Sequence, residues 1–230
     1  MRILCVIPAR GGSRGVPRKN VREVAGRPLL AWTVGHALAS RHDLDVVVST
    51  EDAEIAAVAR SAGARVVDRP AELALDTTPT EPVVRHAIAV VTAERGRPDA
   101  VLLLQATSPV RLPGTVDRAV EEFLAGGADS LVGVVPEPPF FWRAGDPPTA
   151  DYDVSARPRR QDLTPADLRY HETGSLYLTR TEVYEDHDNR IGGRVALFVM
   201  AEVEGVDIDD ELDLAVAEQA LRSLEERPTR

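Results

Sequence analysis

A loop near the start of the chain has the residue types that bind phosphate. Residues 7–20 read Ile-Pro-Ala-Arg-Gly-Gly-Ser-Arg-Gly-Val-Pro-Arg-Lys-Asn and follow an apolar run at residues 3–7. Glycines let backbone N–H groups approach phosphate oxygens closely, and arginine and lysine supply the opposite charge. The loop matches neither G-x-x-x-x-G-K-S/T nor G-x-G-x-x-G. A solvated basic loop is the alternative, but a strand end, glycines and cations together favour a triphosphate site.

A second polar group follows another apolar run, at residues 101–104. Gln105, Thr107, Ser108 and Arg111 come directly after it. If the run is a strand of an open α/β sheet, these side chains lie beyond its carboxyl end, where such sheets bind ligands. Taken alone, the motif favours an ordinary polar turn before a helix.

Two aspartates, Asp207 and Asp209, stand two residues apart in a short apolar stretch. If that stretch is extended, both carboxylates lie on one face of the chain. Mg²⁺ is usually bound by one or two carboxylates together with substrate phosphates, so the pair predicts a site for Mg²⁺ or Mn²⁺. The competing interpretation is acid enrichment at a helix N-terminus, which explains Asp210 and Glu211 well and Asp207 less well.

The hydrophobic pattern predicts a mostly parallel sheet, which would place the first two groups beyond the carboxyl ends of its strands. Short apolar runs alternate with segments of helical spacing, which is typical of a Rossmann-like α/β fold. Thr80 opens one of the helices and is a good N-cap residue. The expected strands are 3–7, 45–49, 65–67, 100–104, 130–135, 175–179 and 195–200, and the expected helices are 29–40, 52–62, 80–94, 115–124 and 211–224.

Residues 136–170 interrupt this pattern. They combine prolines and charges with the aromatic run Phe140, Phe141 and Trp142, and no helix or strand spacing can be followed through them. We expect a single domain, residues 1–230, with this segment as an excursion that forms a homodimer contact or a lid.

Charge and composition exclude several classes of protein. The net charge of −10 argues against a nucleic-acid surface. Residues 1–42 nevertheless hold eight cations against one acid, which indicates a small polyanionic ligand. The single cysteine, Cys5, cannot form an internal disulfide, no apolar run reaches membrane-spanning length, and the histidines show no metal-ligand spacing. A cytoplasmic location without membrane contact is expected.

In several separated motifs the sequence resembles the acylneuraminate cytidylyltransferases, which make CMP-activated sialic acids. The similarity begins in the loop at residues 7–20 and continues nearly from end to end. The further similar stretches are residues 46–52, 69–74, 104–111, 160–163, 174–177 and 206–209.

The resemblance implies a nucleotide-diphospho-sugar transferase type of sheet whose first loop holds the phosphates of CTP. The matching loop positions are Arg10, Gly11, Gly12, Ser13, Arg14, Lys19 and Asn20. Arg69 and Thr80 fall where the family contacts the cytosine end of CTP. Arg14 stands in place of a lysine and Thr80 in place of a serine, so the charge or the hydroxyl is kept while the shape changes.

For the acceptor, the resemblance implies an acidic nine-carbon sugar. The matching sugar-binding positions are Gln105, Thr107, Ser108, Arg160, Gln161 and Tyr177, and the family uses the positions of Asp207 and Asp209 as metal ligands. Ala106 replaces a proline, Thr173 replaces an asparagine, and the segment between residues 161 and 174 is longer than usual in the family. A deaminated or bacterial relative of sialic acid is therefore as plausible an acceptor as N-acetylneuraminate.

The expected reaction is in-line attack of the anomeric hydroxyl on the α-phosphorus of CTP, with Arg10, Lys19 and the metal stabilising charge. Three alternatives stay open. A cytidylyltransferase for another acidic sugar, such as the eight-carbon Kdo, would share the fold. A metal-dependent glycosyltransferase would explain an Asp-x-Asp pair but not the basic glycine loop. A regulatory protein that binds nucleotide without turnover is the third.

Overall fold

The computed structural model describes residues 1–13 and 15–226. Seven strands form one sheet in the order β11-β7-β10-β6-β1-β4-β5, and all of them run parallel except β10. The strands are β1 (Ile3–Pro8), β4 (Leu44–Thr50), β5 (Arg65–Asp68), β6 (Ala100–Leu104), β7 (Ser130–Glu137), β10 (Arg169–Arg180) and β11 (Val195–Val199). The mostly parallel α/β sheet predicted from the sequence is confirmed.

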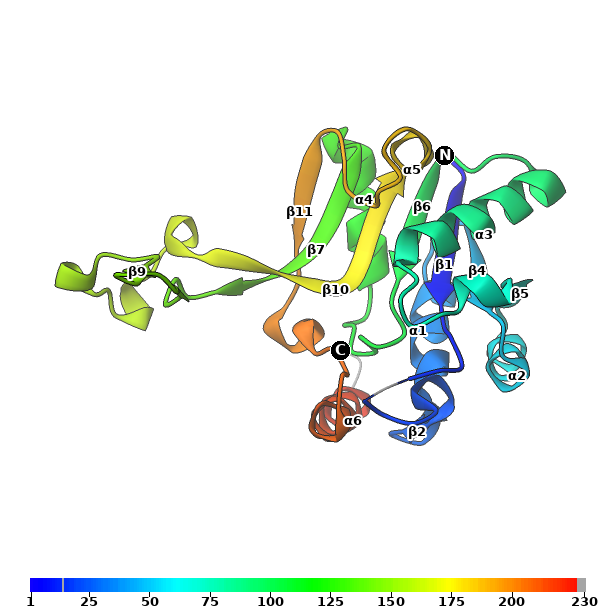
Figure 1. Cartoon of the computed structure of the whole chain (residues 1–230), viewed down its shortest axis with the longest axis horizontal. Helices are drawn as coiled ribbons and strands as arrows, with labels where there is room; N and C mark the ends of the chain where they lie inside the picture. The colour runs from blue at the N-terminus through cyan, green and yellow to red at the C-terminus, as the bar shows by residue number, and fades with distance from the viewer. Residues whose placement is uncertain (14, 227–230) are drawn as a thin grey trace.

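Helices cover both faces of the sheet (Figure 1). They are α1 (Leu29–Leu38), α2 (Ala53–Ser61), α3 (Thr80–Arg95), α4 (Thr115–Gly126), α5 (Thr181–His187) and α6 (Glu211–Glu225). In β1, Cys5 faces the layer with α1, α2 and α4, whereas Val6 faces the layer with α3 and α5. A strand buried on both faces has no polar side, which is why β1 reads as an unbroken apolar run.

Helix α6 lies apart from these two layers and packs under the loop that follows β1. Val16 from this loop, Trp32 of α1, and Ile208 and Leu214 from the C-terminal part of the chain share a third buried cluster. The two ends of the chain therefore build one wall together. This packing brings the stretch at residues 206–209 to the edge of the sheet where β1 ends.

Four elements differ from the sequence-based expectation. A short hairpin, β2 (Glu23–Val24) with β3 (Arg27–Pro28), lies within what was expected to be loop, and α5 was not predicted. Strand β10 begins six residues before the expected 175–179. These elements are too short, or in residues 169–172 too polar and exposed, to give a hydrophobic period.

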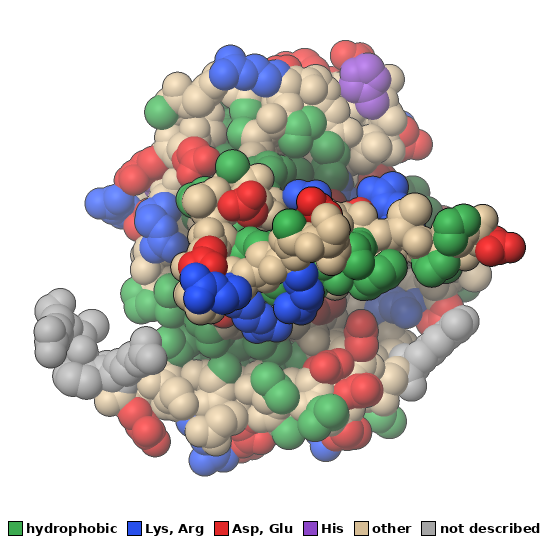
Figure 2. All heavy atoms as spheres, turned by 90° about the vertical axis from the view of Figure 1, so that its left-hand side faces the viewer, with side chains coloured by type: hydrophobic (Ala, Val, Ile, Leu, Met, Phe, Trp, Pro, Cys, Tyr) green, Lys and Arg blue, Asp and Glu red, His purple; other side chains and the backbone are tan. Residues whose placement is uncertain are grey.

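The excursion is an arm that projects from the sheet (Figure 1). Strands β7 and β10 lead into it, and β8 (Trp142–Arg143) pairs with β9 (Thr149–Ala150) inside it. The 3-10 turns η3 (Val154–Ala156), η4 (Arg160–Asp162) and η5 (Pro165–Asp167) complete it. Figure 2, which looks at this side of the molecule, shows basic and hydrophobic side chains gathered together there.

Candidate active site

Three separate segments meet at the carboxyl end of β1 and β6 and, together with residues 69–83, line a cavity of about 370 Å³. They are the loop after β1, the turn after β6, and the stretch before α6. Open α/β sheets bind ligands at this edge because the loops there can differ without disturbing the sheet. The predicted site residues that line the cavity are Arg10, Gly12, Ser13, Lys19, Asn20, Arg69, Thr80, Gln105, Thr107 and Asp209.

The stretch that carries the two aspartates is fixed between the other two segments. Lys19 donates from Nζ to the backbone oxygen of Ile208, and the N–H of Ile208 donates to the backbone oxygen of Thr107 at 2.9 Å. A Cβ on Gly15 would overlap the backbone oxygen of Asp209, so only glycine allows this approach. Asp209 is thereby held at the cavity by backbone contacts.

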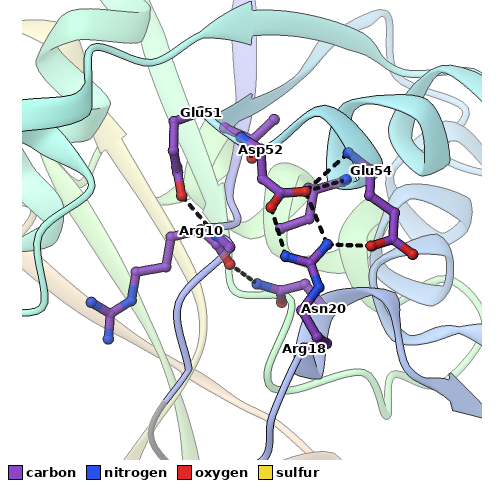
Figure 3. A network of polar contacts seen from close by, with 9 residues as sticks. Arg10, Arg18, Asn20, Glu51, Asp52 and Glu54 are labelled. Carbon is purple, nitrogen blue, oxygen red and sulfur yellow. Dashed lines mark hydrogen bonds and ion pairs between the residues drawn. The ribbon is translucent and has the colours of Figure 1, made fainter.

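The loop after β1 is also braced within itself and from the junction of β4 and α2 (Figure 3). The side-chain amide of Asn20 donates to the backbone oxygen of Arg10 at 3.0 Å. The N–H of Gly11 donates to Oε1 of Glu51 at 2.7 Å. Both contacts fix the peptide group between Arg10 and Gly11. Figure 3 shows that the Arg10 side chain points away from Glu51.

Most of the positive charge counted in residues 1–42 is paired. Arg10 contacts Asp76 at 2.5 Å, and Arg22 and Arg27 pair with acids of α6. Among the described residues, no carboxylate lies within ion-pair distance of Lys19, although it lines the cavity. The charge of Arg10 at the cavity is therefore offset by Asp76, whereas the charge of Lys19 is not offset by any described carboxylate.

Arg69 and Thr80 lie on another wall of the cavity. Arg69 is only 7% exposed and donates to Ser49 through two contacts, to the backbone oxygen at 2.5 Å and to the hydroxyl at 3.2 Å. Burial lowers the pKa of Arg69, while the nearby charge of Glu51 opposes that shift. Thr80 was predicted to cap a helix, but Pro79 is the N-cap residue and no side chain caps α3. The Thr80 hydroxyl is therefore free to face a ligand.

A buried arginine, Arg111, fixes the backbone at Gln105. Arg111 is 1% exposed and donates to the backbone oxygens of Gln105 at 3.1 Å and of Ser175 at 2.8 Å. It also donates to the hydroxyl of Thr33 at 3.0 Å. The Gln105 amide packs over Gly174, where an added Cβ would lie 3.7 Å from Nε2. The turn after β6 is thus tied to both α1 and β10.

Several predicted sugar-binding residues lie elsewhere. Arg160 and Gln161 are exposed in η4 on the arm and do not line the cavity. Tyr177 is 3% exposed, and its hydroxyl donates to Glu172 at 2.5 Å. Burial raises the pKa of Tyr177. Arg14 lies outside the described residues.

The two candidate metal ligands differ in their surroundings. Asp209 is exposed and lines the cavity, whereas Asp207 is partly buried and accepts a hydrogen bond from Ser108 at 3.0 Å. The described residues contain no group of three or more histidine, cysteine or acidic side chains that could hold a metal by themselves. Two carboxylates fit Mg²⁺ or Mn²⁺ when phosphates and water complete the shell.

One wall of the cavity was missed in the sequence. Residues 73–79 contribute Leu73, Leu75, Asp76, Thr78 and Pro79 to the lining. Its position in the chain could have indicated it, because this loop follows β5 and so lies at the same edge of the sheet as the other loops.

No described helix is long and apolar enough to cross a membrane.

Comparison with known proteins gives a consistent result. A family model described as "Cytidylyltransferase" matches residues 4–191. N-acylneuraminate cytidylyltransferase B of Danio rerio is 35% identical over 221 residues, which are 93% of this chain and 50% of the relative. Pseudaminic acid cytidylyltransferase of Campylobacter jejuni is 30% identical over 223 residues, covering 94% of this chain and 95% of the relative. The chain thus spans about half the length of the Danio rerio relative.

Solved structures share the fold at low sequence identity. A CMP:2-keto-3-deoxy-manno-octonic acid synthetase complexed with CTP superposes with a TM-score of 0.70 at 15% identity, over 97% of this chain and 99% of that one. The 4-diphosphocytidyl-2C-methyl-D-erythritol synthase of Anaerococcus prevotii gives a TM-score of 0.66 at 12% identity, over 96% and 98%.

Proposed function

This chain belongs to the cytidylyltransferase family, and from that premise we propose that it transfers CMP from CTP to the anomeric hydroxyl of a nonulosonic, sialic acid type sugar. The observation that carries the proposal is the meeting of the loop after β1, the turn after β6 and the Asp207–Asp209 stretch around one cavity. The relatives named for N-acylneuraminate and pseudaminic acid support the class of acceptor.

We assign the parts of CTP to the walls of the cavity by the chemistry of the side chains. Arg10, Ser13 and Lys19 meet the triphosphate, because they combine two cations with a hydroxyl beside glycine backbone. Arg69 and Thr80 meet the cytosine end. Gln105 and Thr107, on the neighbouring turn, meet the acceptor sugar. These assignments follow the resemblance and agree with the cavity lining.

In the proposed reaction the anomeric oxygen attacks the α-phosphorus and forms a P–O bond as the bond to the β-phosphate oxygen breaks. Pyrophosphate leaves, and the proton of the hydroxyl passes to solvent. Lys19 and Arg10 stabilise the charge that develops on the phosphate oxygens, and Gln105 orients the sugar. Asp207 and Asp209 would hold a Mg²⁺ or Mn²⁺ ion, which supplies further charge neutralisation when bound.

The alternatives are now weaker. A Kdo-type acceptor is supported only by likeness of fold to the octonic acid synthetase. A glycosyltransferase does not explain why a basic glycine loop packs against Asp209. A binding protein without turnover is separated by the assay below.

We further propose that two copies of the chain associate through the arm. Phe141 and Trp142 on the arm are 42% and 53% exposed, and Val195, Leu197 and Val199 form an exposed apolar row on β11. Exposed apolar groups of this kind are typical of a subunit interface. Association would also give Arg160 and Gln161 a way to reach a sugar, in the cavity of the other copy.

The test is a substrate panel. Purified protein with Mg²⁺ is incubated with each of the four nucleoside triphosphates and a set of nonulosonic acids, with Kdo included. We expect pyrophosphate release with CTP and at least one nonulosonic acid. CTP binding without pyrophosphate release for any acceptor would contradict the proposal and support a regulatory protein.

A further inference from the structure

Arg18 has contacts that its place in the phosphate-type loop does not explain. Its guanidinium contacts two acids at the start of α2 (Figure 3), and Arg18 is not among the residues that line the cavity. It donates to both oxygens of Asp52, at 2.6 and 3.1 Å, and to Glu54. Arg18 therefore has its charge balanced by carboxylates and does not face a ligand.

The backbone at Arg18 directs the residues that follow. Arg18 is in the left-handed region, with φ of 55°, which is uncommon for a residue with a side chain. Its backbone oxygen accepts from the N–H of Val21 at 3.1 Å and of Arg22 at 3.2 Å. This turn places Lys19 in the cavity wall and Asn20 against the backbone of Arg10.

The acids that hold Arg18 lie at the start of helix α2. Asp52 is the N-cap of α2, and its Oδ1 accepts from the N–H groups of Glu54 and Ile55 at 2.9 and 3.0 Å. A Cβ on Gly11 would lie 2.6 Å from Oδ2 of Asp52, so the loop also passes directly over this carboxylate. The loop is thus anchored to the end of a helix rather than to another loop.

We propose that Arg18 and Asp52 form a positioning clamp that fixes the turn before Lys19 and so sets where Lys19 meets the triphosphate. The inference rests on the function proposed above. Arg18 acts through Lys19 and does not itself bind CTP. A misplacement of the lysine by about 1 Å is enough to cost a large factor in rate, since charge stabilisation depends on alignment.

The clamp and a direct phosphate contact predict opposite effects of one substitution. If Arg18 were a phosphate ligand, removing the charge of Asp52 would free it, and CTP would bind at least as tightly. If Arg18 is a clamp, the same change loosens the loop and lowers turnover. Asp52→Asn is suited to this test because asparagine is as good an N-cap as aspartate, so α2 is kept.

The experiment compares Arg18→Met, Asp52→Asn and the double variant with a matched control. The control is Arg65→Met, because Arg65 also contacts two acids, Asp45 and Glu94, but at the opposite end of β4. We measure kcat with CTP and acceptor, the Kd of CTP by calorimetry without acceptor, and the melting temperature.

Arg18→Met should lower kcat about tenfold or more, with a smaller change in the Kd of CTP. Asp52→Asn should lower kcat less, because Glu54 still holds Arg18. The double variant should be no worse than Arg18→Met, since contacting residues are not additive. Arg65→Met should keep wild-type kcat.

Two results would overturn the clamp while leaving the proposed function intact. One is an active wild type in which Arg18→Met and Arg65→Met have the same kcat. The other is tighter binding of CTP by Asp52→Asn than by the wild type. A wild type that binds CTP but has no turnover would instead overturn the proposed function and the clamp with it.

Discussion

The cavity at the edge of the sheet and the arm differ in what holds their polar side chains. Around the cavity, Lys19 and Arg111 contact backbone oxygens of neighbouring segments, and Arg111 is fully buried. On the arm, Cζ of Arg157 lies 4.2 Å from the centre of the Phe140 ring, and Arg160 is exposed. Backbone contacts fix a side chain within one chain, whereas exposed cation–π contacts contribute little on their own.

We interpret the cavity as organised by the single chain, and in the proposed dimer a second copy would complete the arm. Changes at the cavity should then act on chemistry at any protein concentration. Changes on the arm should act on association first and on chemistry through it. The following predictions test that division, beginning with the largest expected effect.

Loss of a candidate metal ligand should have the largest effect. Asp209→Asn and Asp207→Asn should each lower turnover by about 10²- to 10³-fold, because each removes a hard oxygen charge at nearly constant volume. Steady-state pyrophosphate release and circular dichroism melting measure activity and fold. The matched control is Asp210→Asn, which keeps the N-cap of α6 and should stay active. Equal losses at residues 209 and 210 would remove the metal assignment.

Lys19→Arg should lower turnover by about 10²-fold, with CTP affinity less affected. The sequence has one lysine among its 27 lysine and arginine residues. A compact ammonium can contact both a phosphate and the Ile208 oxygen, whereas a guanidinium is wider and prefers a flat, bidentate partner. Arg22→Lys is the reverse swap at a nearby ion pair and should change little. Near wild-type turnover in Lys19→Arg would limit Lys19 to general attraction of phosphate.

An arm substitution should change the oligomeric state and leave the Kd of CTP unchanged. Trp142→Ser removes exposed apolar area from the proposed interface, so we expect a dimer for the wild type and a monomer for the variant by light scattering. Turnover should fall with dissociation and recover partly at high protein concentration. Leu124→Ser, an exposed residue of α4, is the control. A monomeric wild type at micromolar concentration would exclude the dimer.

The smallest effect concerns stability beneath the cavity. Burial, and then the charge of Arg111, lower the pKa of His36 from its usual 6.5 to about 4. His36 is therefore neutral in the folded protein above about pH 4, whereas in the unfolded chain it binds a proton below pH 6.5. Its contribution to the stability of the fold is complete above pH 6.5 and is lost as the pH falls toward 4. In this window the unfolding equilibrium constant of the wild type should rise about tenfold for each pH unit by which the pH falls, relative to that of His36→Gln. Urea titrations that give a constant difference would show that His36 does not titrate.

The division between cavity and arm also marks what the sequence could predict. Residues 3–7 and 100–104 are buried on both faces, so their strands, and the loops that follow them, were located from the apolar runs alone. The meeting of Gln105 with the loop that carries Lys19 also followed, because parallel strands place the loops after them at one edge. Asp209 reaches this edge through packing of the C-terminal part of the chain against the loop after β1, which the strand-end argument does not predict.

What could not be predicted depends on contacts between distant residues. The pairing of Arg10 with Asp76, and of Arg18 with Asp52, reduces a basic segment to a few free charges, and no local pattern encodes it. Thr80 was expected to cap a helix, but Pro79 takes the N-cap position. The position of Arg160 on the arm could not be predicted either, since residues 136–170 show no hydrophobic period that indicates a strand or a helix.

The central claim is that CTP and an acidic sugar react within this cavity by transfer of CMP. Phosphorus NMR of the protein with CTP, Mg²⁺ and a nonulosonic acid tests it directly, because it separates transfer from hydrolysis. The account predicts that the CTP resonances give way to those of pyrophosphate and of one phosphodiester that joins cytidine to the sugar. Unchanged CTP, or CMP and pyrophosphate without the phosphodiester, would contradict it.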